Sequence, residues 1–146
     1  FKDEVFARNH PGGSLGRKML TTIGDLMHTG EQVPVVYENS DFSVIISEMT
    51  QKRLGVTLIV DKKKQLKGII TDGDLRRMIE CKKDILKIRA RDLSDSFPKW
   101  LEQNHLATKA VQLMEKYSIT SVVVSANGKK IDGIIHLHDL LKAGII

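Results

Sequence analysis

Apolar residues recur at helical spacing in two stretches of the chain. In the first stretch the apolar residues are Phe42, Ile45, Ile46 and Met49. Their i, i+3, i+4, i+7 spacing places them on one face of a helix. Ser40 or Asp41 precedes them and can serve as the N-cap. In the second stretch the corresponding positions are Leu106, Ala110, Leu113, Met114 and Tyr117. The pattern predicts two amphipathic helices whose apolar stripes belong to the hydrophobic core, not to a cofactor site.

Short runs of β-branched residues follow both helices and predict paired strands. The strands and the polar turn between them occupy residues 56–60, 61–65 and 66–70 in the first stretch and residues 121–124, 125–130 and 131–135 in the second. The dipeptide Asn127-Gly128 is typical of a tight hairpin turn, because both residues tolerate positive φ. A helix is expected to follow each pair, starting near Asp74 or Leu137, and weaker strands are expected before the helices at 33–37 and 99–103.

The second half of the chain repeats the first at an offset of roughly 65 residues. Asp25-Leu26 matches Asp92-Leu93, VTLIV at 56–60 matches TSVVV at 120–124, Gly68-Ile69-Ile70 matches Gly133-Ile134-Ile135, and Asp74-Leu75 matches Asp139-Leu140. Each copy therefore has the order strand, helix, strand, strand, helix. A three-stranded sheet with one apolar face needs a cover, and a second copy can supply it. We expect an α/β (α+β) fold of two tandem β-α-β-β-α repeats packed with pseudo-two-fold symmetry.

Composition fits a soluble module of this kind. The 146 residues are 41% hydrophobic and 28% charged, which suits two small lobes with a shared core. The net charge of +5 arises from basic residues that are scattered except at Lys62 to Lys64, so it favours solvated surface over nucleic-acid binding. The single cysteine, Cys81, cannot form an internal disulfide. Because no signal segment or membrane span is visible, we expect a cytoplasmic protein with no membrane partner.

The stretch GIITDGDLRR at residues 68–77 is the strongest candidate for a binding site. The start of a helix favours an anion such as phosphate, because its N–H groups are unpaired and its dipole is positive there. Thr71 can donate its hydroxyl to a phosphate oxygen, and Asp74 can accept hydrogen bonds from the vicinal hydroxyls of a ribose. The alternative is that Thr71 and Asp72 only cap the helix. Recurrence favours binding, because Asp139 stands at the place of Asp74, although His136 replaces Thr71.

The doubled unit resembles a tandem CBS domain (a Bateman module), whose nucleotide signature is similar to Gly68-Ile69-Ile70-Thr71-x-x-Asp74. The resemblance implies that Thr71 contacts phosphate and that Asp74 contacts ribose, while His136 departs from the signature and Asp139 matches it. It also implies ligand contacts from segments that lead into strands. The candidate nucleotide-binding residues are Val33, Pro34, Gly55, Val56, Thr57, Thr71, Asp72, Asp74, Thr120, Ser121, His136 and Asp139.

Nearly the whole chain resembles the C-terminal part of bacterial D-arabinose 5-phosphate isomerases. The stretches that carry this resemblance are residues 8–17, 25–34, 71–77, 119–124 and 136–145, and its weakest stretch is 94–103. Those enzymes have a sugar isomerase (SIS) domain followed by a CBS pair, and they supply the synthesis of 3-deoxy-D-manno-octulosonate (Kdo) for lipopolysaccharide. The resemblance implies a missing SIS domain, of which residues 1–24 are the tail end and linker; the first residue, Phe1, also suggests an excised piece.

The same resemblance divides the chain into a first CBS repeat at 25–81, a charged inter-repeat linker at 82–91 and a second CBS repeat at 92–146. It makes His10 an active-site histidine of the parent enzyme, stranded and inactive here. Residues 1–24 are expected to be loose or borrowed by a neighbour. No catalytic pair is apparent in the rest of the chain, so we expect no catalysis from this part.

The leading hypothesis is a regulatory module that binds a nucleotide between the two copies. The resemblance favours CMP-Kdo, the activated end product, with an adenine nucleotide as the alternative ligand. A second hypothesis is a ligand-free scaffold for a homodimer or higher homo-oligomer. The expected partners are a small-molecule nucleotide and the chain's own SIS domain, without nucleic acid. Base preference, the number of occupied clefts and the sign of regulation stay open.

A rival hypothesis is a metal site. His136 and His138 alternate with Leu137, so both can point to one side and join Asp139 or His28. A metal needs three or four ligands in a defined geometry, and only a pair is visible locally. We therefore expect no metal and no required cofactor, and we expect His136 to contact an anionic ligand instead.

Overall fold

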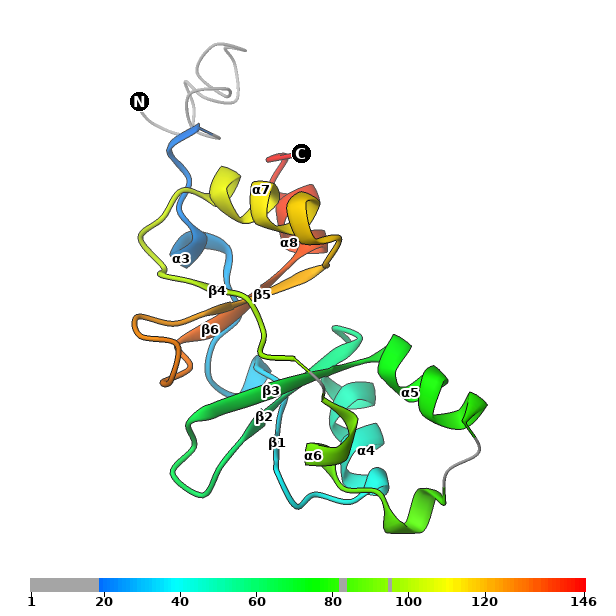
Figure 1. Ribbon diagram of the computed structural model, residues 1–146. Helices are drawn as coiled ribbons and strands as arrows, with labels where there is room; N and C mark the ends of the chain where they lie inside the picture. Colours follow the sequence, from blue (N-terminus) through cyan, green and yellow to red (C-terminus); the bar gives the residue numbers. More distant parts are fainter. Residues whose placement is uncertain (1–18, 82–83, 95) are drawn as a thin grey trace.

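The computed structural model describes residues 19–81, 84–94 and 96–146 (Figure 1). The first lobe comprises β1 (Val35–Tyr37), α4 (Phe42–Lys52), β2 (Val56–Val60), β3 (Leu66–Thr71) and α5 (Asp72–Glu80). The second lobe comprises β4 (Trp100–Leu101), α7 (Ala107–Tyr117), β5 (Ser121–Val124), β6 (Gly133–His136) and α8 (Leu137–Lys142). Short helices lie before the lobes and between them: α3 (Ile23–Leu26), η1 (Gly30–Gln32), η2 (Ile85–Lys87) and α6 (Ala90–Leu93).

Both lobes contain the same three-stranded sheet. The strand orders are β1-β2-β3 and β4-β5-β6, with a parallel first pair and an antiparallel second pair. In the first sheet Leu58 lies between Val35 and Ile69, and in the second Val123 lies between Trp100 and Ile134. The observed β2 and β5 coincide with the predicted strands at 56–60 and 121–124. The predicted order of elements is thus observed in both copies.

The central strands are buried on both faces. All five residues of β2 and all four of β5 are buried. Figure 1 shows helices on the outer side of each sheet, with the two sheets facing each other. The inner faces form one apolar cluster with members from both lobes: Val33, Val56, Leu58, Leu66, Val123 and Ile134. Each lobe therefore supplies the apolar cover that the other sheet needs.

The first helix of each lobe begins and ends where local chemistry dictates. Asp41 is the N-cap of α4, and its Oδ1 accepts a hydrogen bond from the backbone N–H of Val44 at 3.0 Å. Arg53 adopts the left-handed conformation and ends the helix. In the second lobe Ser118 has the same role after α7. Such left-handed C-caps satisfy the last carbonyls of a helix.

The apolar stripes of these helices are narrower than predicted. Ile45 and Met49 are buried in the first lobe, but Ile46 is 37% exposed. In the second lobe Leu106 is the N-cap residue and Tyr117 ends the helix, so both are more than 40% exposed. The prediction that every apolar position of the two stripes belongs to the core was wrong at these three residues.

Two short helices cross between the lobes. Helix α3 precedes the first lobe in the chain, yet Ile23 packs with Ala107 and Leu140 of the second lobe. Helix α6 precedes the second lobe, yet Ala90 packs with Val36, Ile45 and other residues of the first lobe. Backbone hydrogen bonds fix both crossings, from Ile23 N to His105 O at 2.9 Å and from Ala90 N to Ser40 O at 2.9 Å.

These crossings change the picture of the linker and of the chain start. The predicted linker at 82–91 is polar in sequence, but Ile88 and Ala90 are buried near its end. The segment before the first repeat is anchored at Ile23, and His10 lies outside the described residues. Among the helices that the structure describes, none combines the length and apolarity needed to cross a bilayer.

Candidate functional site

A cleft of about 430 Å³ opens between the lobes at the carboxyl end of β3. We call it the interlobe cleft. Its first-lobe side is lined by Val56, Ile69, Thr71, Asp74 and Arg77, and its second-lobe side by Ser96, Phe97, Pro98, Lys99, Ser118, Ile119, Thr120 and Ser121. Five of the predicted nucleotide-binding residues meet here: Val56, Thr71, Asp74, Thr120 and Ser121. Its volume lies within the range of roughly 300–1,000 Å³ that is typical of small-molecule sites.

Thr71 and Asp74 form a capping box at the start of α5. The Thr71 Oγ1 accepts a hydrogen bond from Asp74 N at 3.2 Å, and Asp74 Oδ2 accepts one from Thr71 N at 2.8 Å. The Thr71 hydroxyl also donates to Asp74 Oδ2 at 3.1 Å. The capping alternative is therefore realised, and the same two side chains also line the cleft. Capping and ligand contact are compatible, because a hydroxyl oxygen and a carboxylate have further lone pairs.

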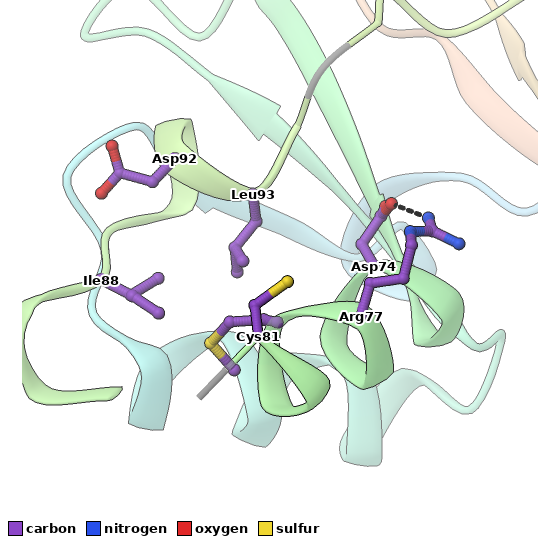
Figure 2. A pocket seen from close by; sticks show the side chains of 7 residues that line it. Asp74, Arg77, Cys81, Ile88, Asp92 and Leu93 are labelled. Carbon is purple, nitrogen blue, oxygen red and sulfur yellow. Dashed lines mark hydrogen bonds and ion pairs between the residues drawn. The ribbon is translucent and has the colours of Figure 1, made fainter. Parts of the chain in front are cut away.

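Arg77 holds the other oxygen of the Asp74 carboxylate, with Nη2 at 2.5 Å from Oδ1. The Arg77 side chain is 67% exposed, so the ion pair is screened by solvent and is weak. Figure 2 shows the pair at the edge of a second hollow, of about 290 Å³, which reaches Cys81, Ile88 and Leu93. Arg77 can therefore leave Asp74 at little energetic cost when a ligand approaches.

Ser121 is the one buried side chain among the described residues whose polar atom has no hydrogen-bond partner. It is only 7% exposed, and it lines the interlobe cleft opposite Thr71. A buried hydroxyl without a partner costs roughly 1–3 kcal/mol, which a ligand oxygen in the cleft would recover. Two cations also line the cleft, Arg77 on the first-lobe side and Lys99 on the second-lobe side. The cleft thus offers hydroxyls, a carboxylate and positive charge together.

The remaining first-copy candidates do not line the interlobe cleft as the structure describes it. Val33 and Pro34 are buried, and Thr57 is buried with its hydroxyl donating to the carbonyl of Leu58 at 3.3 Å. Gly55 and Asp72 contact each other, since Asp72 N donates to Gly55 O at 3.1 Å. These five residues are not part of the lining of the interlobe cleft.

The second copy has the same capping box but a different neighbour. His136 is the N-cap of α8, and its backbone N–H donates to Asp139 Oδ2 at 2.7 Å. The other oxygen, Asp139 Oδ1, lies 2.8 Å from His28 Nε2. The backbone of His28 also pairs with Ile134, by hydrogen bonds of 2.8 and 3.0 Å. Asp139 is therefore already engaged on both oxygens from within the chain.

In the first lobe, the register that matches Asp25-Leu26 with Asp92-Leu93 pairs His28 with position 95, which lies outside the described residues. The preceding residue, Ser94, contacts the sheet through its side chain. Its Oγ accepts a hydrogen bond from Ile69 N at 3.2 Å, as the His28 carbonyl accepts one from Ile134 N in the other lobe. The second oxygen of the carboxylate therefore has a different partner in each lobe: the exposed Arg77 for Asp74, and His28 for Asp139. Neither the contact of His28 with Asp139 nor the places of Phe97 and Arg77 in the interlobe cleft followed from the sequence.

The rival metal site lacks ligands. The rings of His136 and His138 lie edge to face with centroids 4.6 Å apart. Within residues 19–81, 84–94 and 96–146 there is no group of three or more His, Cys, Asp or Glu side chains placed to hold a metal ion.

The stability of the protein is expected to fall in mild acid because of His136. Burial lowers the pKa of His136 below 6.5, His138 and His28 lower it further, and Asp139 opposes them. Its Nδ1 accepts a hydrogen bond from His138 N at 3.0 Å, which requires that nitrogen to be unprotonated. The folded state thus binds fewer protons than the unfolded state. The contribution of His136 is complete above pH ~6.5 and is lost as the pH falls toward the lowered pKa.

Urea denaturation at several pH values checks this expectation. His136→Asn keeps an N-cap acceptor but cannot titrate, so its free energy of unfolding should decline less than that of the parent between about pH 7.5 and 5.5. Equal declines in both proteins would contradict the role given to His136.

Comparisons with known proteins agree with this geometry. The family model described as the CBS domain matches residues 23–80 and 90–145. The arabinose 5-phosphate isomerase KdsD of Yersinia pestis is 41% identical over all 146 residues, which are 100% of this chain and 44% of that protein. The chain thus spans less than half the length of this curated relative.

Solved structures show the same fold. CBSX2 in complex with AMP has a TM-score of 0.72 and 21% identity, covering 86% of this chain and 96% of that one. The CBS domain of a bacterial CNNM/CorC family Mg²⁺ transporter in complex with ATP has a TM-score of 0.74 and 11% identity, covering 93% and 95%. The predicted fold of two tandem β-α-β-β-α CBS repeats and the predicted resemblance are confirmed.

Proposed function

Because the chain belongs to the CBS domain family, we propose that it is the regulatory, nucleotide-binding CBS pair of a cytoplasmic arabinose 5-phosphate isomerase in Kdo and lipopolysaccharide synthesis. The identity of 41% to KdsD over the full chain supports this parent. In this proposal residues 1–24 join an upstream SIS domain, residues 25–81 and 92–146 are the two repeats, and catalysis belongs to the SIS domain together with His10. The CBS pair senses a ligand and alters the attached enzyme.

The observation that carries the proposal is the unpartnered hydroxyl of Ser121 in the interlobe cleft. A buried polar atom without a partner is rare in native proteins, and it calls for an explanation. Thr71 and Asp74 face the same cleft from the other lobe, at the N-terminus of the nine-residue helix α5. Phosphate at the helix start and ribose at Asp74 would use all three groups in one ligand.

The cations of the cleft favour a ligand with more than one anionic group. Arg77 is held by Asp74 until a ligand arrives, and the Lys99 ammonium lies 4.1 Å from the centre of the Tyr117 ring. CMP-Kdo carries a phosphate, a ribose and a sugar carboxylate, which suits this set of cations. An adenine nucleotide is the alternative ligand, because AMP and ATP occupy related CBS proteins.

Asp74→Asn is expected to weaken nucleotide binding by about 10–100-fold, which corresponds to losing hydrogen bonds to a charged group worth roughly 1.5–3 kcal/mol. The asparagine keeps an oxygen for the cap but not the charge. Calorimetry with CMP-Kdo, CMP, AMP and ATP measures the effect. Asp41→Asn, at the N-cap of α4 and outside the cleft, is the matched control. The proposal would be contradicted if none of these nucleotides bound the unsubstituted protein at millimolar concentration.

A scaffold role remains a second candidate, because several helices expose large apolar side chains. Val44 on α4, Ile79 on α5 and Leu141 on α8 are each about half exposed or more. Such residues can be covered by a second copy of the chain in a symmetric homodimer. If the chain is only a scaffold, the Asp74→Asn variant should keep the association state of the unsubstituted protein. Neither the unsubstituted protein nor the variant should then bind a nucleotide.

A further inference from the structure

A third and larger hollow, of about 780 Å³, lies where the β-hairpins of the two lobes meet. We call it the lysine hollow. It is lined by Gly30, Val33, Val35, Tyr37, Glu48, Lys52, Val60, Lys63, Lys64, Gln65, Asn127, Lys129, Lys130, Ile131 and Asp132. None of these residues lines the interlobe cleft. We propose that the lysine hollow is a separate site for a small polyanion with two or more phosphate groups.

Backbone contacts hold the two hairpins together. Leu66 N donates to Lys129 O at 2.7 Å, and Gln65 and Lys130 form an isolated antiparallel bridge. Within the second hairpin, Asn127 Oδ1 accepts hydrogen bonds from Lys129 N and Lys130 N at 2.9 and 3.0 Å. The first hairpin is fixed in the same manner by Asp61 Oδ1, which accepts bonds from the backbone N–H groups of residues 63 and 65 at 2.9 Å. The positions of the lysines are therefore set by ordered turns.

The charges around the hollow are unbalanced. Five lysines and two carboxylates line it, which leaves a net charge of +3. Glu48 is matched by Lys52, whose Nζ lies 2.8 Å from Glu48 Oε2. Among the ion pairs of the described residues, none involves the two hairpin pairs, Lys63 with Lys64 and Lys129 with Lys130. Four lysines from two lobes thus line one hollow without a salt bridge, and Asp132 is the one carboxylate of the lining that Lys52 does not match.

Local strain and an apolar floor add to the argument. Lys64 adopts φ +62°, a conformation that glycine or asparagine takes more readily. Val33, Val35 and Ile131 also line the hollow, and apolar walls strengthen the attraction between the lysines and a bound anion. Lysine ammonium groups act as point charges on flexible stems, so they suit the rounded geometry of phosphate. The two lysine pairs on separate hairpins call for at least two phosphate groups.

Titration with inorganic pyrophosphate tests the proposal, with amide shifts of the hairpins as the readout. Pyrophosphate is expected to shift the amides of residues 63–65 and 129–131, and to bind more tightly than orthophosphate. The double variant Lys129→Glu with Lys130→Glu is expected to bind pyrophosphate at least ~10-fold more weakly, since two attractive charges become repulsive. Absence of hairpin shifts in the parent would overturn the proposal.

A matched control separates this site from general electrostatics. Lys87→Glu with Lys109→Glu changes the net charge by the same amount at exposed positions outside the hollow. Equal weakening in both double variants would show a delocalised charge effect and would overturn the site. Asp74→Asn is expected to bind pyrophosphate in the hollow as the parent does, so the lysine hollow and the nucleotide proposal can fail independently.

Discussion

Replacing Leu58 by alanine is expected to lower the free energy of unfolding by about 2–5 kcal/mol. Leu58 is fully buried at the centre of β2 and packs in the apolar cluster that includes Val123 and Ile134 of the other lobe. Removing its isobutyl group opens a cavity at the contact of the two sheets, where β2 is fixed by pairing on both sides. Denaturation in urea, followed by circular dichroism, measures the loss.

Leu86→Ala is the matched control for this change. Leu86 lies in η2 and is 85% exposed, so the same deletion is expected to alter the free energy of unfolding by no more than ~0.5 kcal/mol. Because the cluster is shared, the two lobes should unfold in one transition in the parent protein. A loss below ~1 kcal/mol for Leu58→Ala would contradict the shared core.

His28→Ser is expected to lower the free energy of unfolding by about 1–3 kcal/mol, because it leaves one oxygen of a largely buried carboxylate without its partner. The Nε2 of His28 lies 2.8 Å from Asp139 Oδ1, and the Asp139 side chain is 15% exposed. Serine removes the imidazole and keeps the backbone groups of residue 28 that pair with Ile134. Urea denaturation at neutral pH is the measurement.

His105→Ser provides the control for His28→Ser. His105 is exposed, and it contacts Ile23 through its backbone carbonyl, which the substitution preserves. The free energy of unfolding of the His105→Ser variant should therefore fall only slightly. A double-mutant cycle of His28→Ser with Asp139→Asn would localise the energy to the pair. Additive losses in that cycle would contradict a direct interaction between His28 and Asp139.

The strands and the main helices follow from local sequence, and the short crossing helices do not. Residues 56–60 and 121–124 are β-branched except for Leu58 and Ser121, and a polar turn follows each run, so their pattern was sufficient. Helices α3 and α6 have four residues each, too few to show a helical period. Ile23 and Ala90 are buried by the lobe that is distant in sequence, which no local pattern reveals.

The candidate site divides in the same way. Thr71 and Asp74 were identified because strand end, cap and helix start adjoin in sequence. Phe97 and Arg77 line the cleft only because two remote segments meet there, and residues 94–103 gave the weakest resemblance. His28 escaped notice as a partner of Asp139 because 111 positions separate them. Sequence repetition matched Asp139 with Asp74 but did not predict the neighbour that distinguishes them.

The crossing of α3 has a mechanical consequence for any domain joined upstream. Such a domain would reach the fold through Ile23, which is seated in the second lobe and not in the first. A ligand that separated residues 71–77 from residues 96–99 would move one lobe relative to the other. The segment that leads into Ile23 would transmit this movement to the upstream domain. Each repeat buries a residue of the helix that precedes the other repeat: Ile23 packs in the second lobe and Ala90 in the first. Cutting the chain between the repeats would therefore remove a core residue from one or both halves.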